Sequence, residues 1–362
     1  MNETLHGDVI EKLKELETGM VQCVVTSPPY WGLRDYGTAT WEGGDADCDH
    51  IETLNLKRDV SGGVSWGRDK GSRGEQPHTS ASKKTYKDIC KKCGSKRIDS
   101  QIGLEKTPEE YVENMVKVFR EVKRVLKKDG TCFLNLGDSY NGSGGAGGDY
   151  NKGGLKDGQP KYKGRNISSL KPKDLVGIPW RVAFALQSDG WWLRQDIIWH
   201  KPNPMPESVT DRCTKSHEYI FLLTKSAKYY YDNDAIREDS VYPDDDRKSR
   251  TKDHQKYAGN GHNTVAFGSA TYPKRNKRSV WTINTQPYKE AHFAVFPPKI
   301  PELCIKAGSK EGDTVLDPFF GSGTTGWVAQ RLGRQWIGIE LNEEYIKIAN
   351  KRFAQRELFI AK

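Results

Sequence analysis

The 362-residue sequence lacks any run of about 20 apolar residues, the length that a membrane-spanning helix needs. Its first 19 residues, MNETLHGDVIEKLKELETG, carry charges throughout and lack the apolar core of a secretory signal. Hydrophobic residues make up only 35% of the chain, and the mean hydropathy is −0.78. We therefore expect no membrane association, a cytoplasmic location in a prokaryotic or phage-infected cell, and much polar loop.

Cysteine is also scarce, with seven residues in the chain. Without a secretory signal, these cysteines are expected to be reduced thiols or metal ligands and not disulfides. An excess of negative charge is missing too, because the formal net charge is +9. A basic chain suits a polyanionic partner such as double-stranded DNA, but charge alone is a weak indicator of nucleic-acid binding.

Regular segments alternate along much of the chain. The patterns predict helices over residues 9–18, 107–130 and 175–190, and strands over residues 20–26, 131–140, 191–204 and 217–226. After residue 292 they predict a helix, a strand, a glycine loop, a helix, a strand and a helix. Alternating strands and helices predict an α/β fold with a parallel, doubly wound sheet.

Residues 312–342, GDTVLDPFFGSGTTGWVAQRLGRQWIGIELN, form the clearest local unit. They predict a strand, a tight turn at Gly321–Gly323, a helix from Thr324, and a second strand that ends at Glu340. Glycines let a backbone approach a ligand closely, and an acid at the second strand tip can bind two ribose hydroxyls. The alternative is an ordinary strand–turn–helix corner.

The segment GSGTTG also matches the dinucleotide pattern GxGxxG, so an NAD-dependent oxidoreductase is a further alternative. Asp317 precedes the glycines, where it would repel a pyrophosphate but would suit the cationic amine of S-adenosylmethionine. About 36 residues follow Gly326, too few for the rest of a nucleotide-binding half. The remaining strands must then come from earlier in the chain, which predicts a circularly permuted sheet.

A second motif, TSPPYW at residues 26–31, ends a β-branched run with two prolines and two aromatics. Proline cannot continue a sheet ladder, so the strand ends here. Together with DPFFGSGTTG at residues 317–326, this motif resembles the amino-methylating DNA methyltransferases. These enzymes transfer a methyl group from S-adenosylmethionine to an exocyclic amine of a base. Because the catalytic motif precedes the cofactor motif, the sequence is similar to their permuted β subgroup.

The resemblance implies a circularly permuted Rossmann-like methyltransferase sheet and three regions. Residues 1–37, 105–225 and 286–362 would form the catalytic domain. Residues 38–104 would form a zinc-binding insertion, and residues 226–285 a target-recognition region. It also implies a set of cofactor-binding positions, with Asp8 at the adenine amine: Asp8, Thr26, Phe293, Pro297, Asp317, Pro318, Phe319, Gly321, Ser322, Gly323, Thr324, Thr325 and Glu340.

The chemistry of amine methylation explains the proline corner. A base amine is a poor nucleophile, because its lone pair is delocalised into the ring. The Ser27 hydroxyl oxygen and the Pro28 carbonyl can accept hydrogen bonds from it and stabilise the developing positive charge. Pro29 restricts Pro28 to extended geometry, and Tyr30 can stack on a base that has left the duplex. The alternative is a structural Pro-Pro turn.

The first residue of this motif bears on the target base. In the family, versions with Asp or Asn mostly methylate adenine N6, and versions with Ser mostly methylate cytosine N4. Ser27 therefore favours N4-methylcytosine, with adenine N6 as the alternative. A non-catalytic, zinc-bearing DNA-binding protein is a more distant alternative. The oligomeric state, a homodimer included, and the existence of a cognate restriction endonuclease stay open.

Cys48-x-His50 and Cys90-x-x-Cys93 flank about 40 residues without a clear period. Two close pairs of this kind match a tetrahedral zinc site of three cysteines and one histidine, which would stabilise an insertion without a core. A redox pair and unrelated free cysteines are the alternatives, and His78 is a rival for the histidine position. Four cysteines in apolar segments are predicted to be packing residues: Cys23, Cys132, Cys213 and Cys304.

DNA contacts are expected from basic residues outside these motifs. The segment YPKRNKRSVW contains a basic run that could contact phosphates or guanine edges: Lys274, Arg275, Lys277 and Arg278. A solvated charged loop is the alternative. His200 and Lys201 lie at a predicted strand end that in relatives is close to the target base, although His200 could equally be structural. The glycine- and lysine-rich residues 141–164 could close over DNA or have no defined structure.

Overall fold

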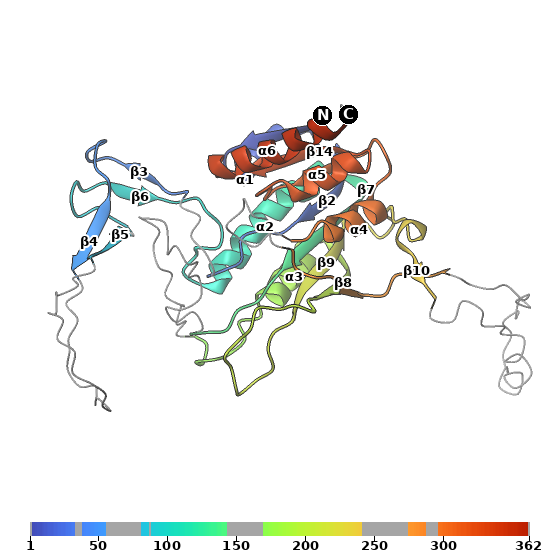
Figure 1. Cartoon of the computed structure of the whole chain (residues 1–362), viewed down its shortest axis with the longest axis horizontal. Helices are drawn as coiled ribbons and strands as arrows, with labels where there is room; N and C mark the ends of the chain where they lie inside the picture. Colours follow the sequence, from blue (N-terminus) through green and yellow to red (C-terminus); the bar gives the residue numbers. More distant parts are fainter. Residues whose placement is uncertain are drawn as a thin grey trace, which may run out of the picture. The chain divides into compact units, whose positions relative to one another are not determined.

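The computed structural model of the chain describes residues 2–32, 38–55, 81–86, 88–142, 169–240, 274–286 and 296–360. The chain divides into two compact units. The first consists of Met1–Pro28, Met115–Gly137 and Pro179–Lys362. The second consists of Pro29–Asn114 and Asp138–Ile178. Figure 1 shows the elements of both units along the chain.

The first unit is built on an eight-stranded sheet whose order is β1-β14-β13-β2-β7-β9-β8-β12. The strands are β1 (Asn2–His6), β2 (Val21–Thr26), β7 (Leu126–Leu136), β8 (Trp192–His200), β9 (His217–Thr224), β12 (Val280–Thr282), β13 (Thr314–Asp317) and β14 (Gln335–Glu340). The β13 strand, which leads into the glycine loop, lies between β14 and β2 in the middle of the sheet.

The strand order confirms the predicted permutation. The unit β13, α5 (Thr324–Arg331), β14 and α6 (Glu343–Ile360) comes last in the chain, yet it forms the centre and one side of the sheet. The first strand, β1, continues the sheet next to the late strand β14 in parallel register, with Asn2 opposite Trp336. Strand β1 thus extends the side of the sheet that is formed by β13 and β14.

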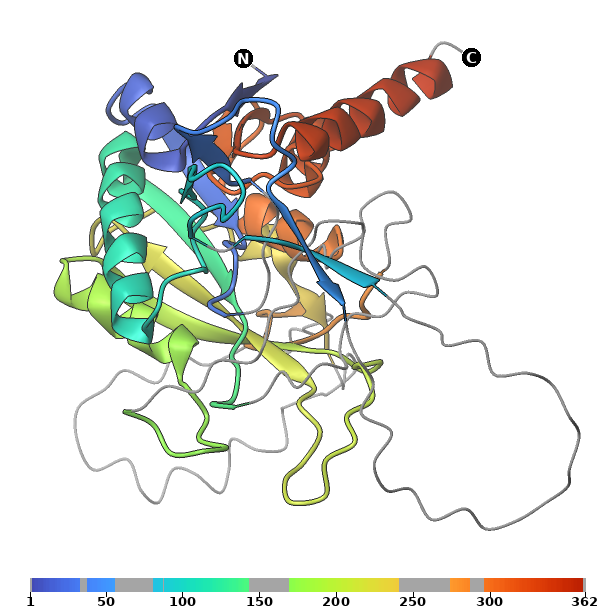
Figure 2. The same cartoon turned by 90° about the vertical axis from the view of Figure 1, so that its left-hand side faces the viewer.

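Helices cover both faces of this sheet. Figure 2 shows α1 (Val9–Glu15), α2 (Pro108–Val125) and α3 (Ile178–Ser188) along one face, with α4 (Lys299–Gly308), α5 and α6 along the other. All six residues of β2 are buried, as expected for a central strand with helices on both sides. The doubly wound α/β architecture is therefore confirmed.

Two details differ from the sequence expectation. The sheet is not parallel throughout, because β9 runs antiparallel to both β7 and β8. Residues 201–216 join β8 to β9 without a helix among them, and a helix-free connection lets the chain turn back as an antiparallel pair. The α2 helix also ends at Val125 and not near residue 130, because Leu126 already pairs with Val21 as the first residue of β7.

The core contains three of the four cysteines that were expected to pack. Cys23, Cys132 and Cys304 are fully buried, and burial raises the pKa of the Cys23 thiol to about 12. Cys213 is exposed, so its prediction as a packing residue is wrong. It lies in the polar connection between β8 and β9, where no neighbouring strand covers it.

The second unit contains two short antiparallel ribbons. One pairs β3 (Thr40–Glu42) with β6 (Lys96–Ile98), and the other pairs β4 (Ile51–Asn55) with β5 (Ala81–Thr85). Isolated two-stranded ribbons are marginally stable at best, so this part of the chain needs another source of stability. No helix among the described residues is long and apolar enough to cross a membrane.

Candidate functional site

The glycine loop between β13 and α5 leaves the backbone of Gly321 open, whereas Gly323 packs against Ala349 and Phe320. Gly321 has a φ of +52° and Gly323 a φ of +75°, conformations that favour glycine. A Cβ atom placed on Gly321 would meet no described atom within 4 Å. The buried Ser322 hydroxyl has no hydrogen-bond partner among the described residues. An orphaned hydroxyl beside an open backbone is suited to receive a ligand.

Glu340 ends β14 on the other side of this loop. Its Oε2 atom accepts a hydrogen bond from the Gly321 backbone N–H at 2.7 Å, and its Oε1 atom accepts one from Asn342 at 2.8 Å. Burial raises the pKa of this carboxyl group. Each oxygen can accept a second hydrogen bond, so Glu340 retains the capacity to bind a pair of hydroxyls.

Asp317, the last residue of β13, is 2% exposed. Its Oδ1 atom accepts hydrogen bonds from the Thr26 hydroxyl at 2.6 Å and from the Phe319 backbone N–H at 3.1 Å. Its Oδ2 atom lies 2.7 Å from the Thr325 hydroxyl. Burial raises the pKa of Asp317 to about 7. One buried side chain thus joins the end of β2, the loop and the first turn of α5.

The motif glycines also accommodate an aromatic ring, which the sequence patterns do not indicate. A Cβ atom on Gly338 would lie 2.3 Å from the Phe320 ring, and one on Gly326 would lie 2.7 Å from it. The same ring stacks on Trp336, with 5.2 Å between ring centroids. These two glycines are therefore required for packing and not for ligand approach. A glycine inside a strand, as at Gly338, is the sequence signal for such a contact.

The other predicted cofactor positions within the loop are mostly enclosed. Phe319 is half-buried, whereas four positions are buried: Pro318, Ser322, Gly323 and Thr324. The Thr324 hydroxyl accepts a hydrogen bond from the Arg352 guanidinium at 2.8 Å, so α6 holds the start of α5.

Three predicted positions lie away from the loop in sequence. Asp8 caps α1, because its Oδ1 atom accepts hydrogen bonds from the backbone N–H groups of Ile10 and Glu11 at 2.9 and 3.2 Å. Pro297 is buried just before α4. Phe293 lies outside the described residues. The second carboxylate oxygen of Asp8 is left for another partner.

The predicted catalytic segment, residues 27–30, begins in the first unit. Thr26 ends β2, Ser27 is half-buried and Pro28 is buried. The residue pairs Cys23–Val315 and Val24–Leu316 place β2 next to β13 in parallel register. Because parallel strands end at the same edge of a sheet, Ser27 and the glycine loop both follow strand ends at that edge.

Pro29 and Tyr30 belong to the second unit, in which three hydrogen bonds hold this segment. The Tyr111 hydroxyl donates to the Pro29 carbonyl at 3.0 Å. The Trp31 indole donates to the Glu105 carbonyl at 3.1 Å, and the Gly32 N–H donates to the Gly103 carbonyl at 2.9 Å. Tyr111 is fully buried in α2, where the sequence patterns assign it no role.

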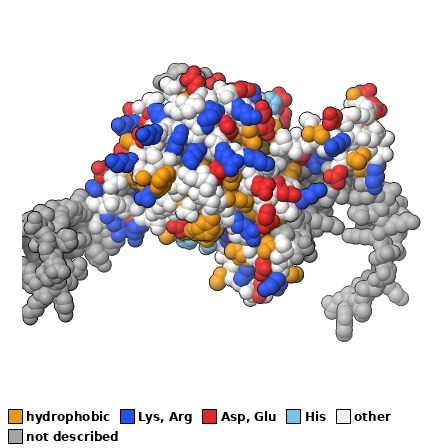
Figure 3. Space-filling view, turned by 180° about the vertical axis from the view of Figure 1, so that it is seen from behind, with side chains coloured by type: hydrophobic (Ala, Val, Ile, Leu, Met, Phe, Trp, Pro, Cys, Tyr) orange, Lys and Arg blue, Asp and Glu red, His pale blue; other side chains and the backbone are white. Residues whose placement is uncertain are grey.

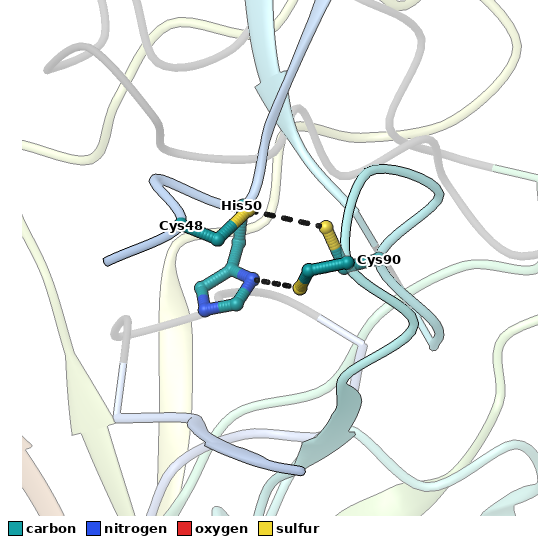
Figure 4. Close-up of side chains that lie close together, drawn as sticks. Cys48, His50 and Cys90 are labelled. Atoms are coloured by element: carbon teal, nitrogen blue, oxygen red, sulfur yellow. Dashed lines mark hydrogen bonds between the residues drawn. The ribbon is translucent and has the colours of Figure 1, made fainter. Parts of the chain in front are cut away.

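The second unit also brings together the four predicted metal ligands, three of which are labelled in Figure 4. Their ligand atoms all lie within 4.8 Å of one another. The sulfurs of Cys48 and Cys90 are 3.7 Å apart, and His50 Nδ1 is 3.6 Å from the Cys93 sulfur. Zinc–sulfur bonds of about 2.3 Å in a tetrahedron place two sulfurs about 3.8 Å apart. A disulfide needs about 2.05 Å, so the arrangement fits zinc and not a disulfide.

Neighbouring side chains fix these ligands. The Trp41 ring stacks on His50 at 4.2 Å between centroids, and Lys92 pairs with Asp49 at 2.7 Å. The Ser95 hydroxyl lies 2.9 Å from the Cys93 sulfur and lowers the pKa of this thiol to about 6. A thiolate is the form that binds a metal. The rival ligand His78 lies outside the described residues.

Most of the basic run lies around the carboxylate of Glu238 in the first unit. Three of its members contact the Glu238 carboxylate: Arg275 at 3.0 Å, Lys277 at 3.1 Å and Arg278 at 2.7 Å. Lys274 is exposed. Asp239 is paired with Lys274 in antiparallel register, so four positive charges face two negative charges and the cluster stays net basic. On the face shown in Figure 3, basic and acidic side chains are interspersed.

His200 is the last residue of β8, and Lys201 follows it directly. The Lys201 ammonium forms an ion pair with Glu218 and lies 4.3 Å from the centroid of the Trp199 ring. His200 is half-buried, with Nδ1 3.2 Å from the Thr282 hydroxyl. The charge of Lys201 is thus already balanced within the protein, and His200 has a partner on the edge strand β12.

A central strand that leads through a glycine loop to a helix, with an acid at the tip of the next strand, forms the core unit of a Rossmann-like sheet, which is circularly permuted here. Residues 21–351 match the family model of the N6/N4 methyltransferases, described as DNA methylase. The chain belongs to this DNA methylase family.

Curated relatives match along nearly the whole chain. The Type II methyltransferase M.SmaI of Serratia marcescens is 42% identical over 357 residues, which cover 97% of this chain and 90% of the relative. The Type II methyltransferase M.Cfr9I of Citrobacter freundii is 42% identical over 353 residues, which cover 96% of this chain and 85% of the relative.

Solved structures share the fold at low sequence identity. The PvuII DNA methyltransferase (cytosine-N4-specific) has a TM-score of 0.54 and 17% identity, over 97% of this chain and 86% of that chain. A putative DNA modification methylase from Thermus thermophilus, complexed with S-adenosyl-L-methionine, has a TM-score of 0.51 and 19% identity, over 98% of this chain and 94% of that chain.

Proposed function

We propose that the protein is a site-specific DNA methyltransferase that transfers a methyl group from S-adenosylmethionine to the N4 amine of a flipped cytosine. One observation carries this proposal. The 2.6 Å hydrogen bond between Thr26 and Asp317 joins the residue before Ser27 to the strand end before the glycine loop. The proposed amine acceptor and the proposed cofactor loop therefore start from neighbouring points of one rigid sheet. Family membership and the Type II methyltransferase relatives support DNA as the substrate.

The glycine loop fits the cofactor. The open side of Gly321 and the orphaned Ser322 hydroxyl offer polar groups to the cofactor, and Glu340 offers two oxygens to the ribose hydroxyls. When bound, S-adenosylmethionine supplies a methyl group activated by its sulfonium charge. The second oxygen of Asp8 is the proposed acceptor for the adenine amine. In this role Asp8, which caps α1, would hold the adenine end of the cofactor.

The proline corner would activate the base. The Ser27 oxygen and the Pro28 carbonyl would accept hydrogen bonds from the two N–H groups of the amine. These hydrogen bonds favour the pyramidal, nucleophilic form of the amine. Pro29 fixes the direction of the Pro28 carbonyl, and the Tyr111 hydroxyl holds the Pro29 carbonyl in turn. Tyr30 stacks on the flipped ring. The methylated amine is acidic enough to lose its proton to water, so no strong base is required.

Ser27 favours cytosine N4 over adenine N6, the second candidate. Both bases present an amine beside a ring nitrogen, so the two acceptors alone do not separate them. Serine stands in the position where the adenine enzymes of the family mostly have Asp or Asn, and this family pattern is the basis of the proposal.

A structural zinc ion in the second unit forms part of the proposal. Cys48, His50, Cys90 and Cys93 would hold it, and the stacked Trp41 would fix the orientation of the His50 ring. Short ribbons without a core gain their stability from such a site. The ion would support the insertion and take no part in methyl transfer.

The basic cluster around Glu238 is the proposed phosphate-binding surface. The acid keeps Arg275, Lys277 and Arg278 together, and DNA phosphates could replace it as their partner. Lys201 is the weaker candidate, because Glu218 already neutralises it. The division into a catalytic domain, an insertion and a target-recognition region stays a prediction, and residues 241–273 of that region lie outside the described residues.

A labelled-methyl assay with a serine pair tests the catalytic proposal. Purified protein is incubated with S-adenosylmethionine that carries a tritiated methyl group and with unmodified DNA. Ser27→Ala should lower kcat about a hundredfold, the order of one lost transition-state hydrogen bond. The exposed Ser100→Ala is the matched control and should transfer methyl groups at the wild-type rate. Equal kcat values for Ser27→Ala and the wild type would overturn the proposed role of Ser27.

A further inference from the structure

We infer that Asp317 is a positioning residue that locks the catalytic strand β2 to the glycine loop and to α5, and that it does not bind the cofactor amine. This inference rests on the proposed function for the identity of the two elements that it joins. Asp317 is 2% exposed, and three donors or hydroxyls already surround its two oxygens: Thr26, Phe319 and Thr325. A direct ionic contact would need an oxygen that faces the ligand space.

The count of protons in this network supports a neutral Asp317. The Thr325 oxygen lies 2.7 Å from Asp317 Oδ2 and 3.2 Å from the Val25 carbonyl oxygen. A hydroxyl has one proton, and a carbonyl oxygen cannot donate. The Thr325 hydroxyl can donate its single proton to Asp317 Oδ2 or to the Val25 carbonyl. Both contacts are hydrogen bonds at the same time only when a protonated Asp317 carboxyl donates to Thr325. Burial raises the pKa of Asp317 to about 7, in agreement with a proton on this group near neutral pH.

The network reaches the catalytic corner through two adjacent residues. Thr325 holds the backbone of Val25, and Asp317 holds the side chain of Thr26, which directly precedes Ser27. On the other side, Asp317 holds the Phe319 N–H at the start of the loop. Any shift of the loop is therefore transmitted to the strand that ends at Ser27. Thr26, Asp317 and Thr325 thus hold the strand that ends at Ser27, the proposed amine acceptor, in a fixed position relative to the glycine loop.

Two substitutions at one position separate positioning from direct binding. Asp317→Asn keeps a donor and an acceptor of the same shape, whereas Asp317→Ala removes both. We expect Asp317→Ala to lower kcat by about tenfold or more, and Asp317→Asn to restore most of that loss. In calorimetry, the Kd of Asp317→Asn for S-adenosylmethionine should stay within about threefold of the wild type. A rise of this Kd by about tenfold would show that the cofactor needs the charge and would overturn the inference.

A stability measurement without cofactor tests the network independently of the proposed function. Thr26→Val and Asp317→Ala each remove the hydrogen bond between these two side chains, so their Tm losses should not add in the double variant. Fully additive losses would contradict the coupling. If the wild type bound no S-adenosylmethionine but the losses were non-additive, the proposed function would fail and the network would stand.

Discussion

We expect Asp317 to make the free energy of unfolding depend on pH, and we expect Asp317→Asn to remove this contribution. Its carboxyl group is buried, which raises its pKa from 3.8 to about 7 in the folded protein. Because the folded-state pKa lies above the unfolded-state value, the contribution to stability is complete below about pH 4. It is lost as the pH rises through about 7.

The size of this loss follows from the pKa change. One pKa unit corresponds to about 1.4 kcal/mol, so a rise from 3.8 to about 7 corresponds to about 4 kcal/mol. Asp317→Asn carries no ionisable group at this position and should escape the loss. Relative to the wild type, the variant should therefore become more stable by up to about 4 kcal/mol between pH 4 and pH 8. Glu340 and Cys132, the titratable groups near Asp317, are present in both proteins.

Urea unfolding at pH 4, 5, 6, 7 and 8 measures this difference, with the exposed Asp47→Asn as the matched control. The free energies of unfolding of the wild type and of Asp47→Asn should fall together as the pH rises, whereas that of Asp317→Asn should fall less. Parallel curves for all three proteins would refute a buried, largely protonated Asp317.

Three further variants, one of them a double substitution, test the other contacts. Glu340→Gln should weaken the binding of S-adenosylmethionine by about tenfold in calorimetry, because a hydrogen bond to a charged group contributes about 1.5–3 kcal/mol; unchanged affinity would remove Glu340 from the site. Cys90→Ser with Cys93→Ser should lose the zinc, about one ion per chain, that elemental analysis finds in the wild type; a wild type without zinc would contradict the site. Tyr111→Phe should lower the free energy of unfolding by about 1 kcal/mol and lower kcat more than the cofactor affinity, because it frees the Pro29 carbonyl; a loss of cofactor affinity alone would contradict this role.

The sequence predicts those parts of the fold that local chemistry determines. The β2 run, the glycine turn and the strand that ends at Glu340 all lie where the patterns place them. The position of β13 before the last helices predicts the permutation, because strands needed beside it must come from earlier in the chain. The close approach within each Cys/His pair is also predictable, because spacing alone brings Cys48 near His50 and Cys90 near Cys93.

Other features depend on contacts between distant residues, which no local pattern records. The antiparallel β9 follows from a helix-free connection, and the early end of α2 follows from the pairing of Leu126 with Val21. Glu238 meets its basic partners from 37 to 40 residues away, and Tyr111 reaches Pro29 across 82 residues. The burial of Asp317 likewise depends on Thr26, which is 291 residues away.

The identity of the methylated base tests the central claim most directly. Purified protein is incubated with S-adenosylmethionine carrying a deuterated methyl group and with unmodified genomic DNA, which is then digested to nucleosides for mass spectrometry. The proposal predicts deuterated N4-methylcytosine, with far less formed by Ser27→Ala in the same time. Deuterated N6-methyladenine alone would contradict the cytosine assignment drawn from Ser27, and DNA without any deuterated base would contradict the proposal that this chain is a DNA amino-methyltransferase.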